Sequence, residues 1–251
     1  SFLPSGFQGL FWSRHVWRAG EVIKTERLSL SGCRRLPSRP RKKKVRRVAT
    51  LDPEAELSHI LMKTGATKFG LFKLSSGKLS PYYIDLRMVP SDPKGLRTVI
   101  KIYEDLVKSD LGVSSFERIA GVPTAGVPYA SILAYRLGKP FLYVRKESKP
   151  HGSERRIEGQ LLPGDRVVVI DDLVTTGKNT LQAAEAIRAE GGQVEHAVVL
   201  IDRQEGAAPT LAGAGLKLHA FTTISRIARR LLEAGVMEDE QYQAILAQIS
   251  A

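Results

Sequence analysis

Cysteine and long apolar runs are nearly absent from this chain of 251 residues. The single cysteine, Cys33, has no partner for a disulfide within the chain, which predicts a reducing, cytoplasmic setting. No run of about 18 apolar residues occurs, so we expect no membrane-spanning helix and no membrane partner. With 43% hydrophobic residues, the composition is that of a globular protein with one sizeable domain and an appendage.

Acidic residues are scarce in the first 48 positions, which hold 13 of the 38 Lys and Arg residues but only two of the 26 acids. The rest of the chain carries 25 basic and 24 acidic residues, so the net charge of +12 belongs almost entirely to the amino-terminal segment. Because the body is nearly neutral, it offers no basic face for nucleic acid, and we expect no such partner.

The segment 1–48 lacks a sustained apolar period and ends in a dense basic run, 39–47, which predicts disorder. Three origins are open: an acid-poor organellar transit peptide, an arm for nucleic acid or a membrane surface, and a non-native extension from a mis-set start or an expression remnant. We favour the third, because the chain does not begin with Met and organised sequence starts abruptly near Leu51.

Two Asp-Pro pairs mark the first expected helices. Asp52-Pro53 puts a capping carboxylate before a proline at the first helical position, and apolar residues follow at helical spacing to about Thr64, where Gly65 closes the helix. Asp92-Pro93 repeats the signal ahead of a longer apolar stripe. Both segments are therefore predicted to be helices.

Beyond Ser115, short β-branched apolar runs alternate with stretches at helical spacing. Strands that are apolar throughout are buried on both faces, which favours a parallel sheet covered by helices on each side. We therefore predict an α/β, doubly wound fold with a mostly parallel sheet. The expected strands are 119–122, 141–144, 167–170, 197–201 and 216–222, and the expected helices are 130–137, 181–189, 224–232 and 238–249.

The most informative segment, 167–180, joins an apolar strand to a helix through a short polar turn. Asp171 and Asp172 end the strand, and Thr-Thr-Gly follows. Ligands bind at the carboxyl ends of parallel strands, where N–H groups at the start of the next helix surround a phosphate dianion. Since the acids would repel bare phosphate, we expect them to accept hydrogen bonds from sugar hydroxyls, with Mg²⁺ nearby.

Each part of this segment has a plainer explanation, because the acids could form a solvated turn and Thr-Thr-Gly a helix cap. As a whole, however, the segment resembles the phosphoribosyl pyrophosphate (PRPP) signature of the type I phosphoribosyltransferases, and it lacks the Walker pattern. In that family the acids hold the ribose hydroxyls and the loop cradles the 5-phosphate. The resemblance implies PRPP contacts from Asp171, Asp172, Leu173, Val174, Thr175, Thr176, Gly177, Lys178 and Asn179.

Three further segments resemble the orotate phosphoribosyltransferases in particular. The segment 143–152 is similar to their catalytic loop, 68–83 to their amino-terminal hood and 201–205 to their orotate-side arginine segment. The resemblance covers roughly residues 50–250, and four ordered motifs are far more specific than one. It implies a phosphoribosyltransferase domain over 49–251, with a small hood mainly in 50–90, a core in 95–225 and C-terminal helices in 224–250.

The basic residues of the catalytic loop suit a leaving pyrophosphate, which carries several negative charges. A solvated basic hairpin is the plainer alternative. The resemblance implies PRPP contacts from Arg145, Lys146, Lys149 and His151, with Lys149, His151 and Asp172 as the catalytic residues.

Orotate is assigned to Thr175 and Arg203, the latter because a guanidinium fork suits a carboxylate. Arg203 could instead form a surface ion pair with Glu205.

Two departures from the family remove positive charge from one side of the pyrophosphate. Ser75 stands where some members carry a lysine, and Thr124-Ala125 stands where they carry Tyr-Lys. Both resemble a second subset of the family with Thr-Ala-Gly at this place, so the activity is still implied. The N–H groups after Thr124 could face pyrophosphate, and a plain helix start after Pro123 is equally open.

The resemblance implies that a ring nitrogen of orotate attacks C1 of PRPP with inversion, giving orotidine 5′-monophosphate for UMP synthesis and releasing pyrophosphate. The transition state is expected to resemble an oxocarbenium ion. The protein would contribute positioning, charge stabilisation and exclusion of water. Mg²⁺ is the expected cofactor, held mainly by PRPP and with no protein ligand assigned. The family also implies a homodimer with shared active sites.

Three rival functions remain open at this stage. A purine or other pyrimidine phosphoribosyltransferase would share the phosphate loop but lack a carboxylate-binding arginine. A PRPP-sensing regulatory protein that binds nucleic acid would need a basic face on the body, and the near-neutral charge argues against it. An RNA-binding role for the basic tail is the third rival.

Overall fold

The computed structural model describes residues 52–73, 79–145 and 156–250. The chain divides into two units, Ser1–Arg46 and Arg47–Ala251, and every described residue belongs to the second. The expectations for the tail 1–48, for Ser75 and for Lys146, Lys149 and His151 therefore lie outside the described residues.

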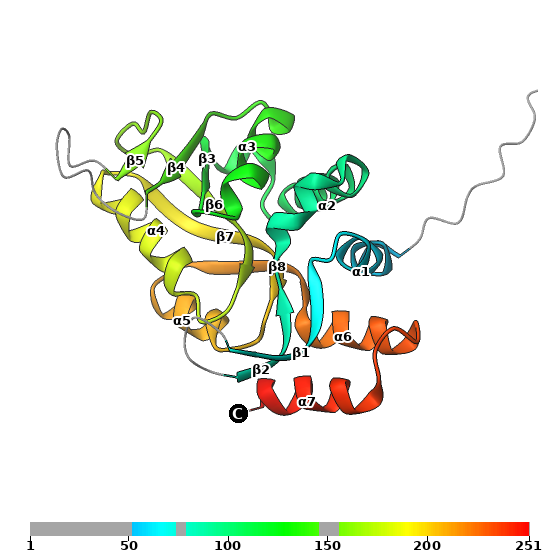
Figure 1. The fold of residues 1–251 in the computed structure, drawn as a ribbon. Coiled ribbons are helices and arrows are strands. Elements are labelled where there is room, and N and C mark those ends of the chain that lie inside the picture. The colour runs from blue at the N-terminus through cyan, green and yellow to red at the C-terminus, as the bar shows by residue number, and fades with distance from the viewer. Residues whose placement is uncertain (1–51, 74–78, 146–155, 251) are drawn as a thin grey trace, which may run out of the picture. The chain divides into compact units, whose positions relative to one another are not determined.

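A six-stranded sheet with the order β5-β4-β3-β6-β7-β8 forms the centre of the second unit (Figure 1). Five strands are parallel, and the two-residue β5 at one edge pairs antiparallel with β4. The doubly wound, mostly parallel sheet predicted from the sequence is confirmed. The bounds are β3 Arg118–Gly121, β4 Phe141–Val144, β5 Ile157–Glu158, β6 Arg166–Val174, β7 Gln193–Asp202 and β8 Lys217–Thr223.

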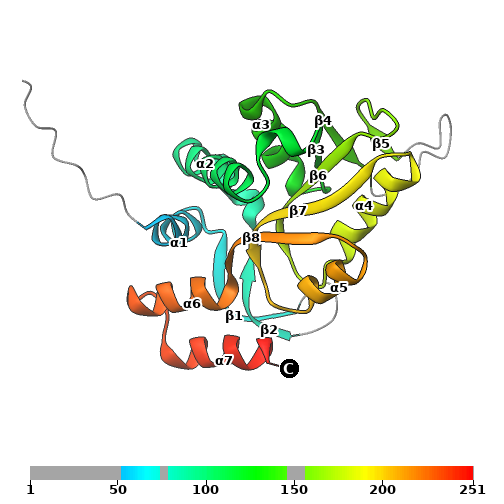
Figure 2. The same cartoon turned by 180° about the vertical axis from the view of Figure 1, so that it is seen from behind.

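Helices cover both faces of this sheet (Figures 1 and 2). Val168 and Ile170 of β6 pack into one core with α1, α2, α3 and α6, whereas Val167 and Val169 pack into a second core with α4 and α5. Successive side chains of a strand point to opposite faces, so two covered faces require a continuous apolar run. The bounds are α1 Pro53–Lys63, α2 Pro93–Asp110, α3 Gly126–Leu137, α4 Lys178–Ala189, α5 Ala207–Gly213 and α6 Ile224–Glu233.

The two Asp-Pro helix starts are confirmed. The Asp52 carboxylate accepts from the backbone N–H of Glu54 at 3.3 Å, and Asp92 accepts from that of Lys94 at 3.3 Å. Each proline occupies the first turn, where the N–H that it lacks would have no partner within the helix.

At the carboxyl ends of the strands, the strand order has the divergence at which open α/β sheets form a crevice for ligands. From β3 the chain passes through α3 to β4 on one side, then returns to β6 on the other side of β3. The connections after β3 and β6 thus diverge, and open α/β sheets bind ligands at such a divergence. The segments that follow β3, β6 and β7 all reach this edge of the sheet.

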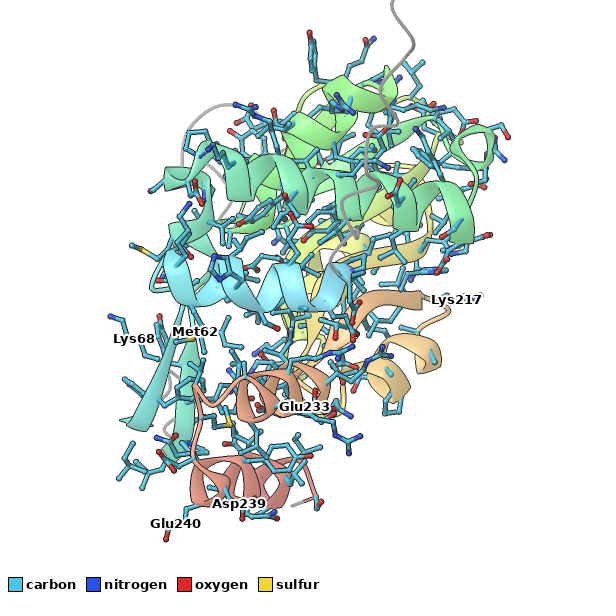
Figure 3. All side chains as sticks on the ribbon, turned by 90° about the vertical axis from the view of Figure 1, so that its right-hand side faces the viewer. Met62, Lys68, Lys217, Glu233, Asp239 and Glu240 are labelled. Atoms are coloured by element: carbon cyan, nitrogen blue, oxygen red, sulfur yellow. The ribbon has the colours of Figure 1, made fainter. Side chains whose placement is uncertain are left out.

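The hood contains a small second sheet of two strands, followed by a 3-10 helix. Strands β1 (Thr67–Lys73) and β2 (Leu79–Ile84) pair antiparallel, and the 3-10 helix η1 (Leu86–Ser91) leads into α2. Helix α7 (Asp239–Ile249) packs on β2 and α6. Figure 3 shows α1 between α2 and α6, with α7 beyond α6 and Lys68 of the hood on the side opposite Lys217 of β8.

Some helices and strands were not predicted from the sequence. The hairpin β1-β2 was missed because its pairing register shifts between Phe69 and Phe72, which breaks a strict alternation. Helix α5 and strand β5 are too short to show a period, and the short 3-10 helix η2 (Val113–Ser115) has none. No helix in the described part of the chain is long and apolar enough to cross a membrane.

Candidate active site

Asp171 and Asp172 lie within β6, before its end. The sequence pattern ended this strand at Ile170, but pairing with β7 continues to Val174. Both acids are buried, with 7% and 8% of their surface exposed. A solvated turn is therefore excluded.

Burial dominates the electrostatics of the two acids. It raises the pKa of the Asp171 carboxyl well above its ordinary value, and the neighbouring charge of Asp172 raises it further. Burial also raises the pKa of Asp172. One Asp171 carboxylate oxygen accepts from the backbone N–H of Asp172 at 2.9 Å. Burying two carboxyl groups at the crevice is unfavourable in free energy, and hydrogen bonds from hydroxyl groups or a nearby cation would offset this desolvation.

The backbone beneath the acids is clamped by two helices. The Tyr103 hydroxyl of α2 donates to the carbonyl oxygen of Asp171 at 2.7 Å. At the start of α3, a Cβ on Gly126 would lie 2.6 Å from the carbonyl oxygen of Ile170 and 2.9 Å from Cα of Asp171. Only glycine permits this approach, so α3 holds β6 at the position of the acids.

The predicted phosphate loop connects β6 to α4. Gly177 has a φ of +82°, which favours glycine, and it precedes the helix without a side chain to cap the first N–H groups. A Cβ here would also lie 3.0 Å from Leu211 Cγ. The loop therefore presents backbone donors at the positive end of α4, as phosphate binding requires.

The residues assigned to PRPP divide into two groups. Leu173 and Val174 pack with the two hydrophobic cores, which leaves their backbone for a ligand. The second group belongs to the loop and the first turn of α4, at the edge of the crevice. Gly177 is buried, and the polar residues of this group are half-buried or exposed: Thr175, Thr176, Lys178 and Asn179.

Arg203 follows β7 directly and lies beside the loop, since its backbone N–H donates to the carbonyl oxygen of Val174 at 2.9 Å. Only 6% of the residue is exposed, so the ion pair with Glu205 expected as an alternative is present but is buried and does not lie at the surface. Nη2 is 3.0 Å from a carboxylate oxygen of Glu205, but its N–H directions miss that oxygen, and it has no hydrogen-bond partner among the described residues. A buried guanidinium nitrogen in this state is suited to an incoming anion.

Tyr82 of the hood supports Arg203. Nε of Arg203 donates to the Tyr82 hydroxyl at 3.0 Å, and the guanidinium carbon lies 4.7 Å from the ring centroid. Tyr82 is itself buried, with 1% of its surface exposed. Sequence reasoning did not single out Tyr82, because no local pattern pairs a hood strand with a residue 121 positions later.

The loop after β7 is held at both ends. The carboxylate of Asp202 accepts from the N–H of Gln204 at 2.8 Å, and the side-chain oxygen of Gln204 accepts from the N–H of Ser225 at 3.2 Å. Gln204 has a φ of +58°, a left-handed conformation that these two bonds maintain. Arg203 is thus fixed by its neighbours as well as by Tyr82.

Arg145 lies where the catalytic loop of the family would begin. Its backbone N–H donates to the carbonyl oxygen of Arg156 at 2.7 Å, which ties the two flanks of segment 146–155 together. Its guanidinium lies 3.4 Å from Glu158. The structure thus shows the base of the loop, and the PRPP contacts of its basic residues stay predictions.

The segment after β3 allows either of its sequence interpretations. Helix α3 begins at Gly126, whose own N–H is used by the carbonyl oxygen of Val122 at 3.0 Å. Ala125 at the N-cap provides no side-chain cap. Donation to pyrophosphate would therefore fall to the N–H groups after Gly126, and the role of this turn stays a prediction.

Arg87 is a cation of the hood that sequence reasoning missed. Asp85 binds it through two contacts of 2.6 and 2.7 Å, and the Tyr129 hydroxyl donates to the carbonyl oxygen of Leu86 at 2.6 Å, which fixes the segment on α3. Asp85 chiefly raises the pKa of Arg87, with a smaller contribution from the charge of Asp172. Arg87 therefore lies within electrostatic reach of the buried acids.

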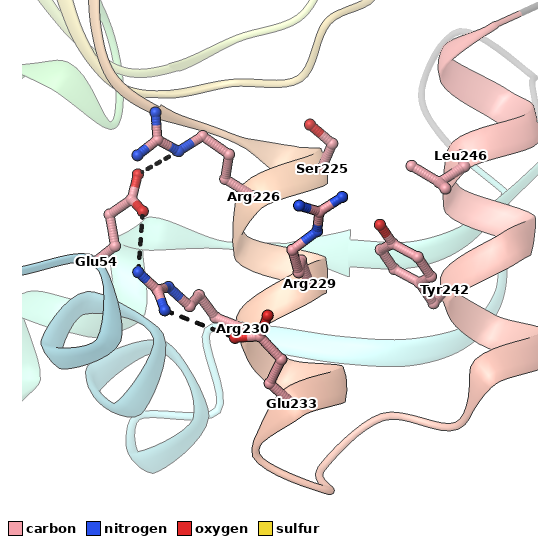
Figure 4. A pocket seen from close by; sticks show the side chains of 8 residues that line it. All are labelled: Glu54, Ser225, Arg226, Arg229, Arg230, Glu233, Tyr242 and Leu246. Carbon is pink, nitrogen blue, oxygen red and sulfur yellow. Dashed lines mark ion pairs between the residues drawn. The ribbon is translucent and has the colours of Figure 1, made fainter. Parts of the chain in front are cut away.

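Two further features lie outside this crevice. A cavity of about 550 Å³ between α1, α6 and α7 is lined by Glu54, Ser225, Arg226, Arg229, Arg230, Glu233, Tyr242 and Leu246 (Figure 4). Arg226 lies 2.7 Å from Glu54, and Arg230 pairs with Asp52, so carboxylates already balance these cations. No buried polar atom without a partner lines it among the described residues, and we assign it no ligand.

The second feature is a hydrogen-bonded chain at the amino-terminal end of β7 and β8. His196 Nδ1 lies 3.1 Å from His219 Nε2, and His219 Nδ1 lies 3.2 Å from the carboxylate of Asp110. Within the described ranges, no cluster of three or more His, Cys, Asp or Glu side chains is arranged for a metal ion.

Comparison with known proteins agrees with this geometry. Residues 91–215 match the family described as phosphoribosyl transferase domain. An orotate phosphoribosyltransferase of Cenarchaeum symbiosum is 44% identical over 180 residues, which cover 72% of this chain and 90% of that one.

Solved structures give the same result. The crystal structure of orotate phosphoribosyltransferase from Aeropyrum pernix superposes with a TM-score of 0.64 at 38% identity, covering 72% of this chain and 99% of that chain. The structure of Leishmania donovani UMP synthase gives a TM-score of 0.71 at 34% identity, and the match covers 78% of this chain but only 42% of that longer one.

Proposed function

Because the chain belongs to the orotate phosphoribosyltransferase family, we propose that it transfers the phosphoribosyl group of PRPP to orotate, giving orotidine 5′-monophosphate and pyrophosphate. It is an enzyme, a pentosyltransferase of pyrimidine biosynthesis. The observation that carries the proposal is the contact between the backbone N–H of Arg203 and the Val174 carbonyl oxygen, because it puts a buried arginine beside the loop that we propose to bind phosphate.

The loop and the two acids would hold the donor substrate. Backbone N–H groups from Thr175 into the first turn of α4 would bind the 5-phosphate, and Asp171 and Asp172 would accept hydrogen bonds from the ribose hydroxyls. Since the ribose would then be fixed from both ends, its C1 would face the neighbouring arginine segment. Fixing the reacting atoms in this way contributes to catalysis by orientation.

Orotate would bind between the loop and the hood. Nη2 of Arg203, which has no hydrogen-bond partner among the described residues, would donate to the orotate carboxylate, and Thr175 would contact the base from the loop side. Tyr82 would keep the guanidinium in place for orotate, since its hydroxyl accepts from Nε and its ring lies against the guanidinium. Orotate is already an anion, so positioning and exclusion of water suffice without a strong general base.

The leaving pyrophosphate would be met by basic residues of the catalytic loop. We propose Lys149 and His151 as catalytic residues there, with Arg145 and Lys146 as further PRPP contacts. When bound with PRPP, Mg²⁺ would supply charge neutralisation on the pyrophosphate. The buried carboxyls Asp171 and Asp172 fit a nearby divalent cation, because their desolvation is unfavourable for the charged form.

Loss of orotate absorbance with PRPP and Mg²⁺ tests the proposed function directly. We expect steady turnover that depends on both substrates and is unaffected by deletion of residues 1–48. Preference for adenine or hypoxanthine over orotate would replace the proposal with a purine enzyme. PRPP binding without any base consumption would favour the regulatory protein.

Arg87→Ala should raise the KM for PRPP about fivefold, because it removes a cation that lies within electrostatic reach of Asp172 and so of the proposed PRPP site. The effect should shrink at high salt, since the side chain is 58% exposed and its charge is screened. Arg97→Ala, an exposed arginine of α2, is the matched control. An unchanged KM for PRPP at low salt would leave Arg87 as a partner of Asp85 alone.

We also propose a homodimer in which Lys149 acts in the partner's active site, as the family resemblance implies. Mixing Lys149→Ala with Asp172→Asn under subunit exchange should restore up to about a quarter of wild-type specific activity, because half of randomly paired dimers would contain one intact site. Differently tagged subunits would verify exchange. If exchanged samples stay as inactive as the separate variants, the loop acts within its own chain.

A cytoplasmic location is part of the same proposal. It rests on the single cysteine, which fits a reducing compartment, and on the pathway of the family.

A further inference from the structure

Helix α7 reaches the orotate side of the crevice through one residue, Gln248. Its Nε2 donates to a carboxylate oxygen of Glu205 at 3.4 Å, and its Oε1 accepts from the Ser80 hydroxyl of β2 at 3.1 Å. Ser80 is fully buried and also contacts the carbonyl oxygen of Tyr82 at 2.8 Å. Gln248 therefore links the hood strand that carries Tyr82 to the loop that carries Glu205.

The oxygen of Glu205 that Gln248 binds is the same one that lies near Arg203. Oε1 of Glu205 is 3.0 Å from Nη2 of Arg203, yet that nitrogen has no hydrogen-bond partner in the described part of the chain. The charge of Glu205 thus offsets part of the unfavourable desolvation of the Arg203 guanidinium, while the N–H groups of Nη2 stay without an acceptor among the described residues. A carboxylate that accepted from the guanidinium in the fork–fork geometry that Arg and carboxylates prefer would occupy the donors of Arg203.

The packing of helix α7 fixes the place of Gln248 beside Glu205. Ile245 and Tyr242 are buried, with 1% and 9% of their surface exposed, and they anchor the helix against its neighbours. Ile245 and Gln248 are three residues apart and so lie on the same side of the helix. The packing of Ile245 consequently places the amide of Gln248 next to Glu205.

We propose that Gln248 is a positioning residue that fixes the direction of the Glu205 carboxylate in its ion pair with Arg203, so that the N–H groups of Nη2 stay available to the carboxylate of orotate. This inference rests on the proposed function and deepens it: selectivity for a carboxylated base depends on a helix that does not touch the base. Without the amide of Gln248, the Glu205 carboxylate would compete with the orotate carboxylate for the N–H groups of Arg203.

Gln248→Ala should raise the KM for orotate about five- to tenfold, with kcat and the KM for PRPP within about twofold of wild type. Glu205→Gln removes the competing charge, so adding Gln248→Ala to it should raise the KM for orotate no further. A role of Gln248 in helix packing alone would instead add the same increase in both backgrounds. Gln243→Ala, at an exposed position of the same helix, is the control for folding and should match wild type.

The outcomes separate this inference from the proposed function. Wild-type protein that does not use orotate overturns the proposed function. Wild-type protein that uses orotate, with an unchanged KM in Gln248→Ala or additive effects in the double variant, overturns the positioning role only. Selective loss of orotate affinity that vanishes in the Glu205→Gln background is the result we expect.

Discussion

Asp172→Asn should lower kcat/KM for PRPP by about ten- to a hundredfold, because one charged hydrogen bond to a ribose hydroxyl contributes about 1.5 to 3 kcal/mol. The same substitution should raise the melting temperature of the substrate-free protein. Asp172 is buried and its pKa is raised by desolvation, so at neutral pH its charge is unfavourable in the folded state. Asparagine keeps the shape of the side chain without the charge.

The pH dependence of this stability difference has a definite sign. The unfolded chain loses the Asp172 proton near pH 3.9, whereas the folded protein keeps it to a higher pH. Between these two values the unfolded state binds fewer protons, so the free energy of unfolding of wild type falls as pH rises. The advantage of Asp172→Asn should therefore be absent below about pH 3.9, grow as pH rises and then level off.

Thermal melts from pH 4 to 8, together with initial rates at saturating orotate, measure both effects. Asp105→Asn, at an exposed position of α2, is the control and should change neither. Normal kinetics in Asp172→Asn would remove the assignment of the acids to ribose. Loss of activity with loss of stability would mean that the carboxylate supports the fold.

Arg203→Ala should lower kcat/KM for orotate by about a hundredfold while the KM for PRPP stays near wild type. The reason is that a buried guanidinium with an unused donor would be the carboxylate receptor, and neither Tyr82 nor Gln204 carries a cation that could replace it. Arg203→Lys should recover only part of the loss, because an ammonium keeps the charge but cannot donate as a fork. Neither variant should gain use of adenine or hypoxanthine.

Removing Arg203 leaves Glu205 partly buried without its cation, which could destabilise the protein by itself. Arg203→Ala combined with Glu205→Gln avoids this problem and should fold normally while staying defective with orotate. Initial rates over a range of orotate concentrations at fixed PRPP give the comparison. If the folded double variant keeps the wild-type KM for orotate, the carboxylate is bound elsewhere.

Local patterns account for the secondary structure that carries the proposed acids and loop. The acids and the loop occupy one strand, turn and helix, so their relation depends on backbone geometry within 167–180 alone. The strand was nevertheless predicted to end too early. Pairing of Asp171 to Val174 with β7 outweighs the low strand propensity of aspartate, and that pairing is a property of the sheet.

What the sequence determined by itself is the α/β fold, the strand, turn and helix of segment 167–180 and the presence of an arginine after the next strand. These features follow from apolar period, turn chemistry and the adjacency of parallel strands, which act over a few residues or between neighbouring elements. The tertiary structure alone decided that this arginine is buried and which groups surround it. Tyr82 lies 121 positions before Arg203, and Gln248 lies 43 positions after Glu205. Contacts of such separation depend on where the hood and the last helix pack, and no local preference of the chain specifies that.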